Sequence, residues 1–290
     1  MSALLNLTVY GLADGAILAL VALGFVLIYK ATGVINFAQG EFLLVGAYTF
    51  HAAFVVFGLP ITAAVLVGVL GAIVLGVVVE RFILRPMVGE SAISVIMVTI
   101  GLAAVLRAVV QLFFGTSVRE QPAVLPTGSV SFAGATLPVN RLLVIAVSTL
   151  ALVAFTIFFR RSRHGVAMRA VADDQQAALT MGISVRRVFA MSWALAAVSA
   201  FVAGVLLSDI GAVEQNIASF GLIVFPVVIL GGLDSVPGTV VGGLVIGLLK
   251  QYVSGYADPG LAEVVPYVVL VAILLVRPYG LFGDVRIERV

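Results

Sequence analysis

RRSRHGVAMRAVADDQQAALTMGISVRR, residues 160–187, decides how the rest of the chain folds. It contains six of the chain's 16 Lys and Arg residues and separates two uncharged runs, Leu142–Phe159 and Val188–Ser208. Runs of this length are typical of membrane-spanning helices. A basic excess is typical of loops on the cytoplasmic side of a membrane. We therefore predict that residues 160–187 form a cytoplasmic loop between two spans.

The composition is that of a membrane protein. Of 290 residues, 62% are hydrophobic and 10% are charged, whereas about 25% of residues are charged in soluble domains. A soluble core could not bury this much apolar surface, so lipid must cover part of it. Because a transmembrane helix needs ~20 apolar residues, we predict an all-α, polytopic integral membrane protein with about eight transmembrane segments. Residues 1–290 then form a single transmembrane domain.

Other apolar runs predict five further spans. They are Tyr10–Tyr29, Val34–Phe57, Ile61–Val79, Ile93–Phe114 and Leu261–Val276. Lys30 and a short basic loop at Glu80–Glu90 would lie on the cytoplasmic side, with the N-terminus outside. Residues 115–140 contain several Pro, Gly and Ser and predict an external loop, with a short hairpin at SVSFAGATL. Asp209–Ser219, which has two acidic residues and no basic one, predicts another external loop.

Asp14 and Arg107 are charged residues inside two of these spans. We predict that Asp14 reaches the lipid headgroups at the outer end of the first span, with a functional role as the alternative. An Arg at the bilayer centre costs from ~3 to more than ~10 kcal/mol. Arg107 lies toward the outer end of the fourth span, so we predict that its side chain snorkels to the interface. Thr99, in mid-span, is expected to return its hydroxyl bond to the preceding turn.

Phe220–Lys250 is too long for one ordinary span and too short for two. Seven glycines and two prolines interrupt it, with a break at GGLDSVPG. We predict a broken or re-entrant pair of short helices that meet at an inner turn, because breaks within a membrane survive only where protein or water satisfies the backbone. The last span would then end in the cytoplasm with Arg277, Arg286 and Arg289. One tilted helix is the alternative, which would put those arginines outside.

The glycines of Phe220–Lys250 are candidates for two roles, lining the translocation path and packing helices together. Gly231 and Gly232, in the turn, are candidates for the translocation path. Small residues four apart allow close helix approach, and such pairs occur at four candidate packing positions: Gly238, Gly242, Gly243 and Gly247. Gly11 and Gly15 make a weaker pair. No convincing sequence repeat is present, although an inverted structural repeat can exist without one.

The basic loop itself predicts two short helices. VAMRAVA forms the first after Gly165, and Asp173 or Asp174 caps the second, QQAALTM, which Gly182 ends. Small alanines would let a partner backbone approach, and methionines offer adaptable apolar contact. The alternative is a solvated connector. The residues predicted to couple to a partner are Gly165, Met168, Arg169, Ala170, Asp173, Asp174, Gln176, Ala177, Ala178, Met181 and Gly182.

Catalysis and nucleic-acid binding are poorly supported. The net charge is +2, but the charges sit at span ends, so we expect no nucleic-acid partner. The chain has no cysteine, and its two histidines, His51 and His164, fall on different elements. HExxH and GxxxxGK[ST] motifs are both absent. We therefore expect no catalytic residue, no metal site and no nucleotide bound by this chain.

Three blocks carry a family resemblance. QAALTMG (176–182) is similar to the EAA loop of ABC-importer permeases, with Gln176 where many such loops have Glu. The blocks ALGFVLIYKATGVINFAQGEFLLVGAY (22–48), RAVADDQQAALTMGI (169–183) and ILGGLDSVPGTVVGGLVIGLL (229–249) resemble LivH-type permeases of branched-chain amino acid ABC importers. The blocks stand in matching order on a chain of matching length. The departure at Gln176 puts in doubt a charge contact, not the docking shape.

The resemblance implies a permease subunit that moves branched-chain or similar hydrophobic amino acids across the bacterial inner membrane by alternating access. It also implies a second related permease, two cytoplasmic ATPases that use the ATP, and a periplasmic substrate-binding protein. Permeases for urea, short amides or other small carboxylates are the nearest alternatives. A self-sufficient secondary transporter is the alternative from another class, and it predicts ionisable residues in mid-span.

NFAQGEF (36–42) is the second candidate for the path. Asn36, Gln39 and Glu41 are polar groups at the predicted inner end of a span and would line a gate. The alternative is an ordinary helix start with a favourable acid, which gains ~0.3–1 kcal/mol from the helix dipole.

Overall fold

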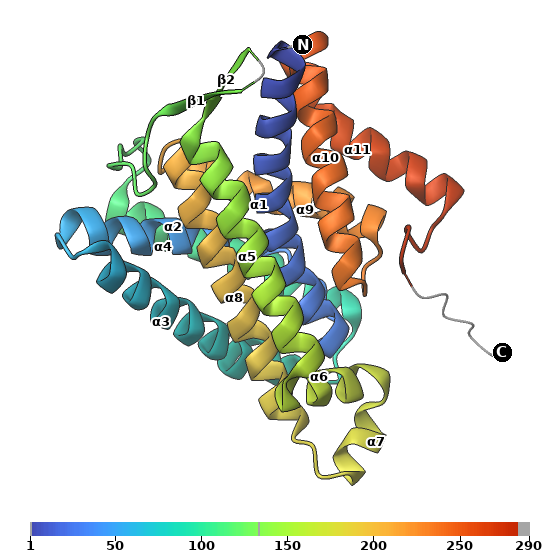
Figure 1. The fold of residues 1–290 in the computed structure, drawn as a ribbon. Helices are drawn as coiled ribbons and strands as arrows, with labels where there is room; N and C mark the ends of the chain where they lie inside the picture. The colour runs from blue at the N-terminus through green and yellow to red at the C-terminus, as the bar shows by residue number, and fades with distance from the viewer. Residues whose placement is uncertain (1, 133, 284–290) are drawn as a thin grey trace.

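The computed structural model describes residues 2–132 and 134–283 and is a bundle of long apolar helices (Figure 1). Within these residues, seven helical segments are long and apolar enough to cross a membrane. The long helices are α1 (Ser2–Thr32), α3 (Ile61–Val79), α4 (Ala92–Phe114), α5 (Val139–Arg161), α8 (Val185–Ile210), α10 (Val236–Tyr256) and α11 (Pro259–Val276). The chain is a multi-pass membrane protein.

Shorter elements connect these helices. They are α2 (Gln39–His51), α6 (Arg163–Asp173), α7 (Gln175–Thr180), α9 (Phe220–Gly231), the π-helical turns η1 (Ala52–Val56) and η2 (Glu80–Leu84), the 3-10 turns η3 (Arg85–Met87) and η4 (Gln215–Ser219), and strands β1 (Ser129–Phe132) and β2 (Ala135–Pro138). The predicted hairpin is confirmed, with Val130 paired antiparallel to Leu137.

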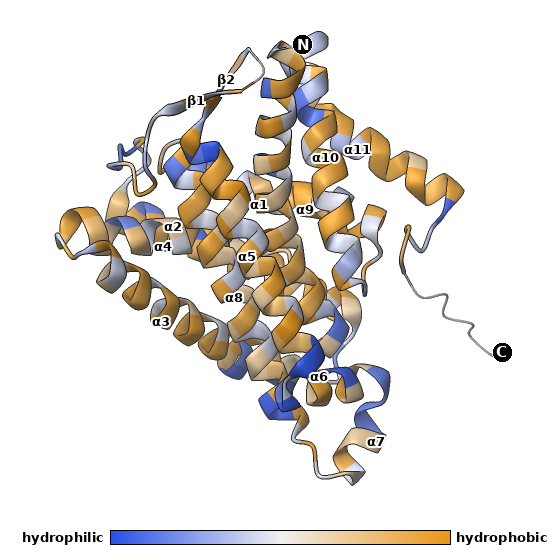
Figure 2. Ribbon diagram, viewed as in Figure 1, coloured by the Kyte–Doolittle hydropathy of each residue, from blue (hydrophilic) through white to orange (hydrophobic). Residues whose placement is uncertain are grey.

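Helix α1 is the centre of the bundle. It packs along α10, α8 and α5, and almost its whole apolar stretch is buried. By contrast, α3, α4, α5 and α11 expose Leu, Ile and Val side chains, and the ribbon in Figure 2 is coloured as hydrophobic along most of α3 and α11. This arrangement places a protein-covered helix inside a ring of helices whose outer faces suit lipid.

Most predicted spans are confirmed, and two predictions about connections are wrong. The second span does not begin at Val34, because residues 33–38 are not helical and α2 starts only at Gln39. The predicted loop at Glu80–Glu90 is largely helical, since η2 and η3 continue α3. The Glu80 carboxylate, which is buried, accepts two hydrogen bonds from Arg85 at 2.7 and 3.1 Å and stabilises that extension.

Phe220–Lys250 is divided between two helices, as predicted, but only the first is short. Helix α10 continues to Tyr256, so it is a full span. Gly232 at the break has a φ of +106°, a conformation that L side chains rarely adopt. The residues after α11 return to this break, where the Phe282 N–H donates to the Gly231 carbonyl at 3.1 Å. Arg277 therefore lies at this end of the bundle, whereas Arg286 and Arg289 lie outside the described residues.

The helices are paired in the same pattern twice. The contact of α1 with α10 corresponds to that of α8 with α3. Likewise, the contact of α2 with α4 corresponds to that of α9 with α11. Helices α1 and α8 are antiparallel, because Leu20 contacts Ser199 while Gly24 contacts Ala196. The two short helices α2 and α9 meet near their starts, where a Cβ on Gly40 would lie 3.0 Å from the Cα of Gly221. The fold therefore contains an inverted structural repeat.

The two ends of the bundle differ in charge. At one end, here called the basic end, Lys30 donates to the Asp234 carbonyl at 3.2 Å, and the Glu80–Glu90 segment lies beside α7. At the other, the hairpin end, Asp209 accepts hydrogen bonds from the backbone of residues 124 and 125. The prediction that the basic segments share one end is confirmed. The side of the membrane that this end faces stays a prediction.

Candidate functional site

The break before α2 is held by polar side chains. The Asn36 Oδ1 accepts from the Ala38 N–H at 3.0 Å, and its Nδ2 donates to Gln39 at 3.1 Å. The Phe37 N–H donates to the Thr99 hydroxyl of α4 at 3.3 Å. Thr99 also donates to the Ile96 carbonyl, as predicted, at 2.8 Å. These bonds replace those that a continuous helix would make.

Asn36 and Gln39 are only 1% exposed. Gln39 extends toward α8, where its amide donates to the Ala196 carbonyl at 3.5 Å. Both side chains therefore secure the break from inside the protein. Their role in a gate stays a prediction.

Glu41, in the first turn of α2, forms an ion pair that the sequence pattern did not predict. Its carboxylate lies 2.6 Å from the guanidinium of Arg107 on α4. The prediction that Arg107 snorkels to the interface is wrong, because it binds Glu41 instead. The Glu41 side chain is 7% exposed and that of Arg107 is 47% exposed.

The exposure of Arg107 indicates which surroundings this face of α4 requires. Charged side chains within membrane spans almost always face protein or a water-filled cavity. A half-exposed guanidinium inside a span therefore cannot be covered by lipid alone. The surface of α4 around Arg107 is the best candidate in the described residues for a polar path.

Asp14 forms a second polar contact, nearer the hairpin end. Its carboxylate lies 2.7 Å from Arg141 of α5 and accepts from the Gln251 amide of α10 at 2.7 Å. The guanidinium of Arg141 also stacks 4.7 Å above the ring of Tyr10. The prediction that Asp14 reaches lipid headgroups is wrong, since it joins three helices.

Helix α6 folds back from the end of α5 at a tight corner. The Ser162 hydroxyl caps α6 by accepting from the Gly165 N–H at 2.9 Å. A side chain at Gly165 would collide with the Phe159 carbonyl. Arg169 donates to the same carbonyl and stacks over the Phe159 ring at 5.5 Å. Arg169 therefore holds the corner, and its role in coupling stays a prediction.

Helix α7 presents the exposed part of the coupling segment. The Asp174 carboxylate caps it, accepting from the Gln176 and Ala177 N–H groups at 2.8 and 2.9 Å, and Gly182 ends it with a φ of +80°. Ala178 packs inward, whereas Leu179 is 57% and Met181 is 80% exposed. The remaining predicted coupling residues divide in the same way: Gly165 and Met168 are buried, Ala170 is half-buried, and Asp173, Gln176 and Ala177 are exposed.

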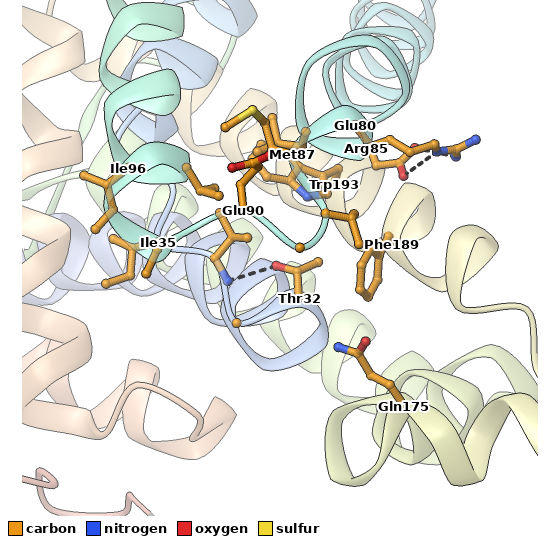
Figure 3. Close-up of a pocket in the computed structure, with 17 residues that line it drawn as sticks. Thr32, Ile35, Glu80, Arg85, Met87, Glu90, Ile96, Gln175, Phe189 and Trp193 are labelled. Atoms are coloured by element: carbon orange, nitrogen blue, oxygen red, sulfur yellow. Dashed lines mark hydrogen bonds and ion pairs between the residues drawn. The ribbon is translucent and has the colours of Figure 1, made fainter.

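A pocket links α7 to the break before α2 (Figure 3). It has a volume of about 320 Å³. Its lining includes Thr32 at the end of α1, Ile35 from the break, Phe189 and Trp193 from α8, and Gln175 at the start of α7. The start of α7 and the break before α2 therefore lie on the walls of the same pocket.

The predicted packing glycines make close helix contacts. A Cβ on Gly243 would lie 2.7 Å from the Gly15 carbonyl, and one on Gly247 would lie 2.5 Å from the Gly15 nitrogen. Gly238 packs against Gly231, and Gly242 against the backbone of Val227 in α9. All four glycines thus lie where another helix backbone is close, and Gly15 belongs to the contact of Gly243 and Gly247.

Gly231 and Gly232 are covered by protein. Gly231 packs against α10, and a Cβ on Gly232 would lie 2.5 Å from the nitrogen of Gly283. Their place in a translocation path stays a prediction. Among the described residues, no group of three or more His, Asp or Glu side chains could hold a metal ion.

Comparisons with known proteins agree on one family. A family model described as "Branched-chain amino acid transport system / permease component" matches residues 7–274. The chain is 33% identical to the high-affinity branched-chain amino acid transport system permease protein LivH of Salmonella typhimurium, over 97% of this chain and 96% of that protein. It is 30% identical, over the same shares, to the permease protein BraD of Pseudomonas aeruginosa.

A solved structure has a similar fold. PsaBC from Streptococcus pneumoniae, in complex with Fab, gives a TM-score of 0.51 at 13% sequence identity, with 93% of this chain and 91% of that chain covered. This likeness concerns the fold alone.

Proposed function

The chain belongs to the branched-chain amino acid transport permease family, and on that premise we propose that it is the transmembrane subunit of an ATP-driven importer for branched-chain amino acids. The observation that carries this proposal is the agreement of LivH and BraD permeases over nearly the whole chain. In this proposal the chain itself binds no ATP, and the ATPases are separate subunits.

The partners follow from the two ends of the bundle. The basic end faces the cytoplasm, in keeping with the distribution of Lys and Arg. An ATPase docks on α7, where Leu179 and Met181 expose apolar surface. The hairpin end faces a substrate-binding protein. A second, related permease covers the face of α4 that carries Arg107.

The Glu41–Arg107 pair recognises the polar part of the substrate. An amino acid is a zwitterion, so its carboxylate can bind the guanidinium of Arg107 while its ammonium group binds Glu41. The substrate then replaces one ion pair with two. Ile100, which is exposed and lies two turns before Arg107 on the same face of α4, suits a branched aliphatic side chain.

Coupling runs from α7 to this pair. ATPase closure moves α7, the pocket beside Gln175 changes shape, and the break at residues 33–38 shifts the start of α2. Glu41 lies in the first turn of α2, so the ion pair opens and closes with that movement. This sequence of contacts provides the alternating access.

Co-purification with the ATPases tests the docking. Leu179→Asp and Met181→Asp place a charge on the exposed face of α7 without touching the core. We expect each to lower the amount of ATPase recovered with the tagged permease at least fivefold. Phe132→Asp, a matched change of an exposed apolar residue (64% exposed) at the hairpin end, should leave recovery unchanged. Equal recovery from all three variants would contradict the docking site.

One observation favours a second candidate, a secondary transporter. Glu41 is an ionisable residue buried within a span, as ion coupling requires. Uptake of labelled leucine into proteoliposomes separates the two functions. The importer requires the ATPases and internal ATP, whereas a secondary transporter works without them and stops when a protonophore or ionophore removes the gradient.

A further inference from the structure

A groove runs along the outside of the bundle between α5 and α10, with α1 as its floor. Its middle part is a cavity of about 320 Å³. The lining is apolar except for two threonines: Ala16, Ala19, Thr149, Leu152, Val153, Thr156, Ile157, Val240 and Leu244. Figure 1 shows α5 and α10 on either side of α1. We call this feature the α5–α10 groove.

The groove continues into a wider cavity at the basic end. This cavity has a volume of about 760 Å³ and shares Thr156 and Val240 with the apolar part. Three cationic side chains line it: Lys30, Arg160 and Arg169. In Figure 2 the residues change from mostly hydrophobic in the middle of α5 to hydrophilic where α6 begins.

The charge at this end is positive overall. Asp234 also lines the wider cavity, so the four ionisable side chains leave a net positive charge of two. The start of α10, capped by Ser235, adds the positive end of a helix dipole at Val236. An anion is therefore favoured in the wider cavity, next to the apolar part of the α5–α10 groove.

The length of the groove matches one leaflet of a bilayer. From Thr149 to Arg160, α5 advances about 16 Å at ~1.5 Å per residue. The hydrocarbon of one leaflet is about 15 Å deep, half of the ~30 Å core. An amphiphile with a headgroup beside Arg160 would thus have its acyl chain beside Thr149.

We propose that the α5–α10 groove is a binding site for one anionic phospholipid of the leaflet at the basic end. The acyl chain lies between α5 and α10 on Ala16 and Ala19, and the phosphate lies between Lys30 and Arg160. Basic pockets between transmembrane helices are recognised sites for anionic headgroups. Because Arg169 both lines this cavity and holds the α5–α6 corner, the bound lipid stabilises the segment through which the ATPase acts.

Native mass spectrometry of the full-length permease, titrated with phosphatidylglycerol or phosphatidylcholine, tests the site. We expect phosphatidylglycerol to bind at least fivefold more tightly than phosphatidylcholine. Lys30→Gln with Arg160→Gln should remove that preference. Arg187→Gln is the charge control, because Arg187 is exposed at the same end and lines neither cavity.

A second pair of variants tests the apolar part without changing charge. Val153→Trp fills the groove and should lower phosphatidylglycerol binding at least fivefold. Leu150→Trp, on the exposed face of α5 outside the groove, should leave binding unchanged. The proposal would be overturned if Val153→Trp and Leu150→Trp lost binding equally, or if Val153→Trp left binding unchanged. Displacement of the lipid by millimolar inorganic phosphate would overturn it too. Equal binding of the two lipids would overturn it as well.

Discussion

Removal of Arg107 should destabilise the protein more than removal of its partner. Arg107→Leu leaves the Glu41 carboxylate, 7% exposed, buried without a counter-charge. Breaking a buried ion pair costs about 3–5 kcal/mol. Because the Arg107 side chain is 47% exposed, solvent screens part of the interaction, and we reduce the expected cost to about 1–3 kcal/mol. Glu41→Leu leaves a guanidinium that water can reach, so we expect a loss of about 0–1 kcal/mol.

The double variant shows whether the two residues act as a pair. Replacing both charges by apolar groups is often neutral, so Glu41→Leu with Arg107→Leu should be more stable than Arg107→Leu alone. Thermal unfolding of the purified permease in detergent measures the order of the three variants. At about 2–4 °C per kcal/mol for chains of 150–250 residues, Arg107→Leu should lower Tm by several degrees.

Leucine uptake separates stability from function in the same variants. The double variant should regain stability and still fail to transport, because its binding pair is gone. Additive losses of stability would show that the ion pair is not coupled. Normal uptake by the double variant would refute the proposed substrate contact.

Two further predictions concern helix contacts. Gly247→Ala places a methyl group 2.5 Å from the Gly15 nitrogen, which is closer than normal contact, so we expect the free energy of unfolding to fall by about 1–3 kcal/mol. Gly101→Ala in α4, where a Cβ meets no atom within 4 Å, should raise it by about 0.5–1 kcal/mol. Thermal unfolding compares the two variants. Asp174→Ala removes the α7 cap, so hydrogen exchange of residues 175–180 should rise by about five- to tenfold, as expected for a cap worth ~1 kcal/mol, whereas Asp173→Ala should leave it unchanged.

The spans could be predicted because each one is encoded locally. A helix in lipid must supply its own hydrogen bonds and an apolar surface over about 20 residues, so length and hydropathy suffice for α3, α4 and α8. Length and hydropathy do not predict the break before α2. Val34–Phe57 is apolar enough to be one span, yet Asn36 and Thr99 offer the backbone other partners, and those bonds depend on α4 being adjacent.

The candidate site could be predicted only in part. Asp174 was one of two possible caps, because capping is a local property of sequence. Glu41 and Arg107 are 66 residues apart, and nothing near either residue indicates that their helices touch. Likewise, Asp14 and Arg141 meet only because α5 packs on α1. Long-range ion pairs follow from tertiary packing, which hydropathy does not describe.

The corner between α5 and α6 joins two helices of unequal length. A side chain at Gly165 would collide with the Phe159 carbonyl, and Arg169 donates to that same carbonyl, so the corner has little room to bend. At ~1.5 Å per residue α6 is about 16 Å long and α5 about 34 Å, and the far end of α5 carries Arg141, the partner of Asp14. A stiff corner of this kind would transmit a movement of α6 through α5 to the opposite end of the bundle.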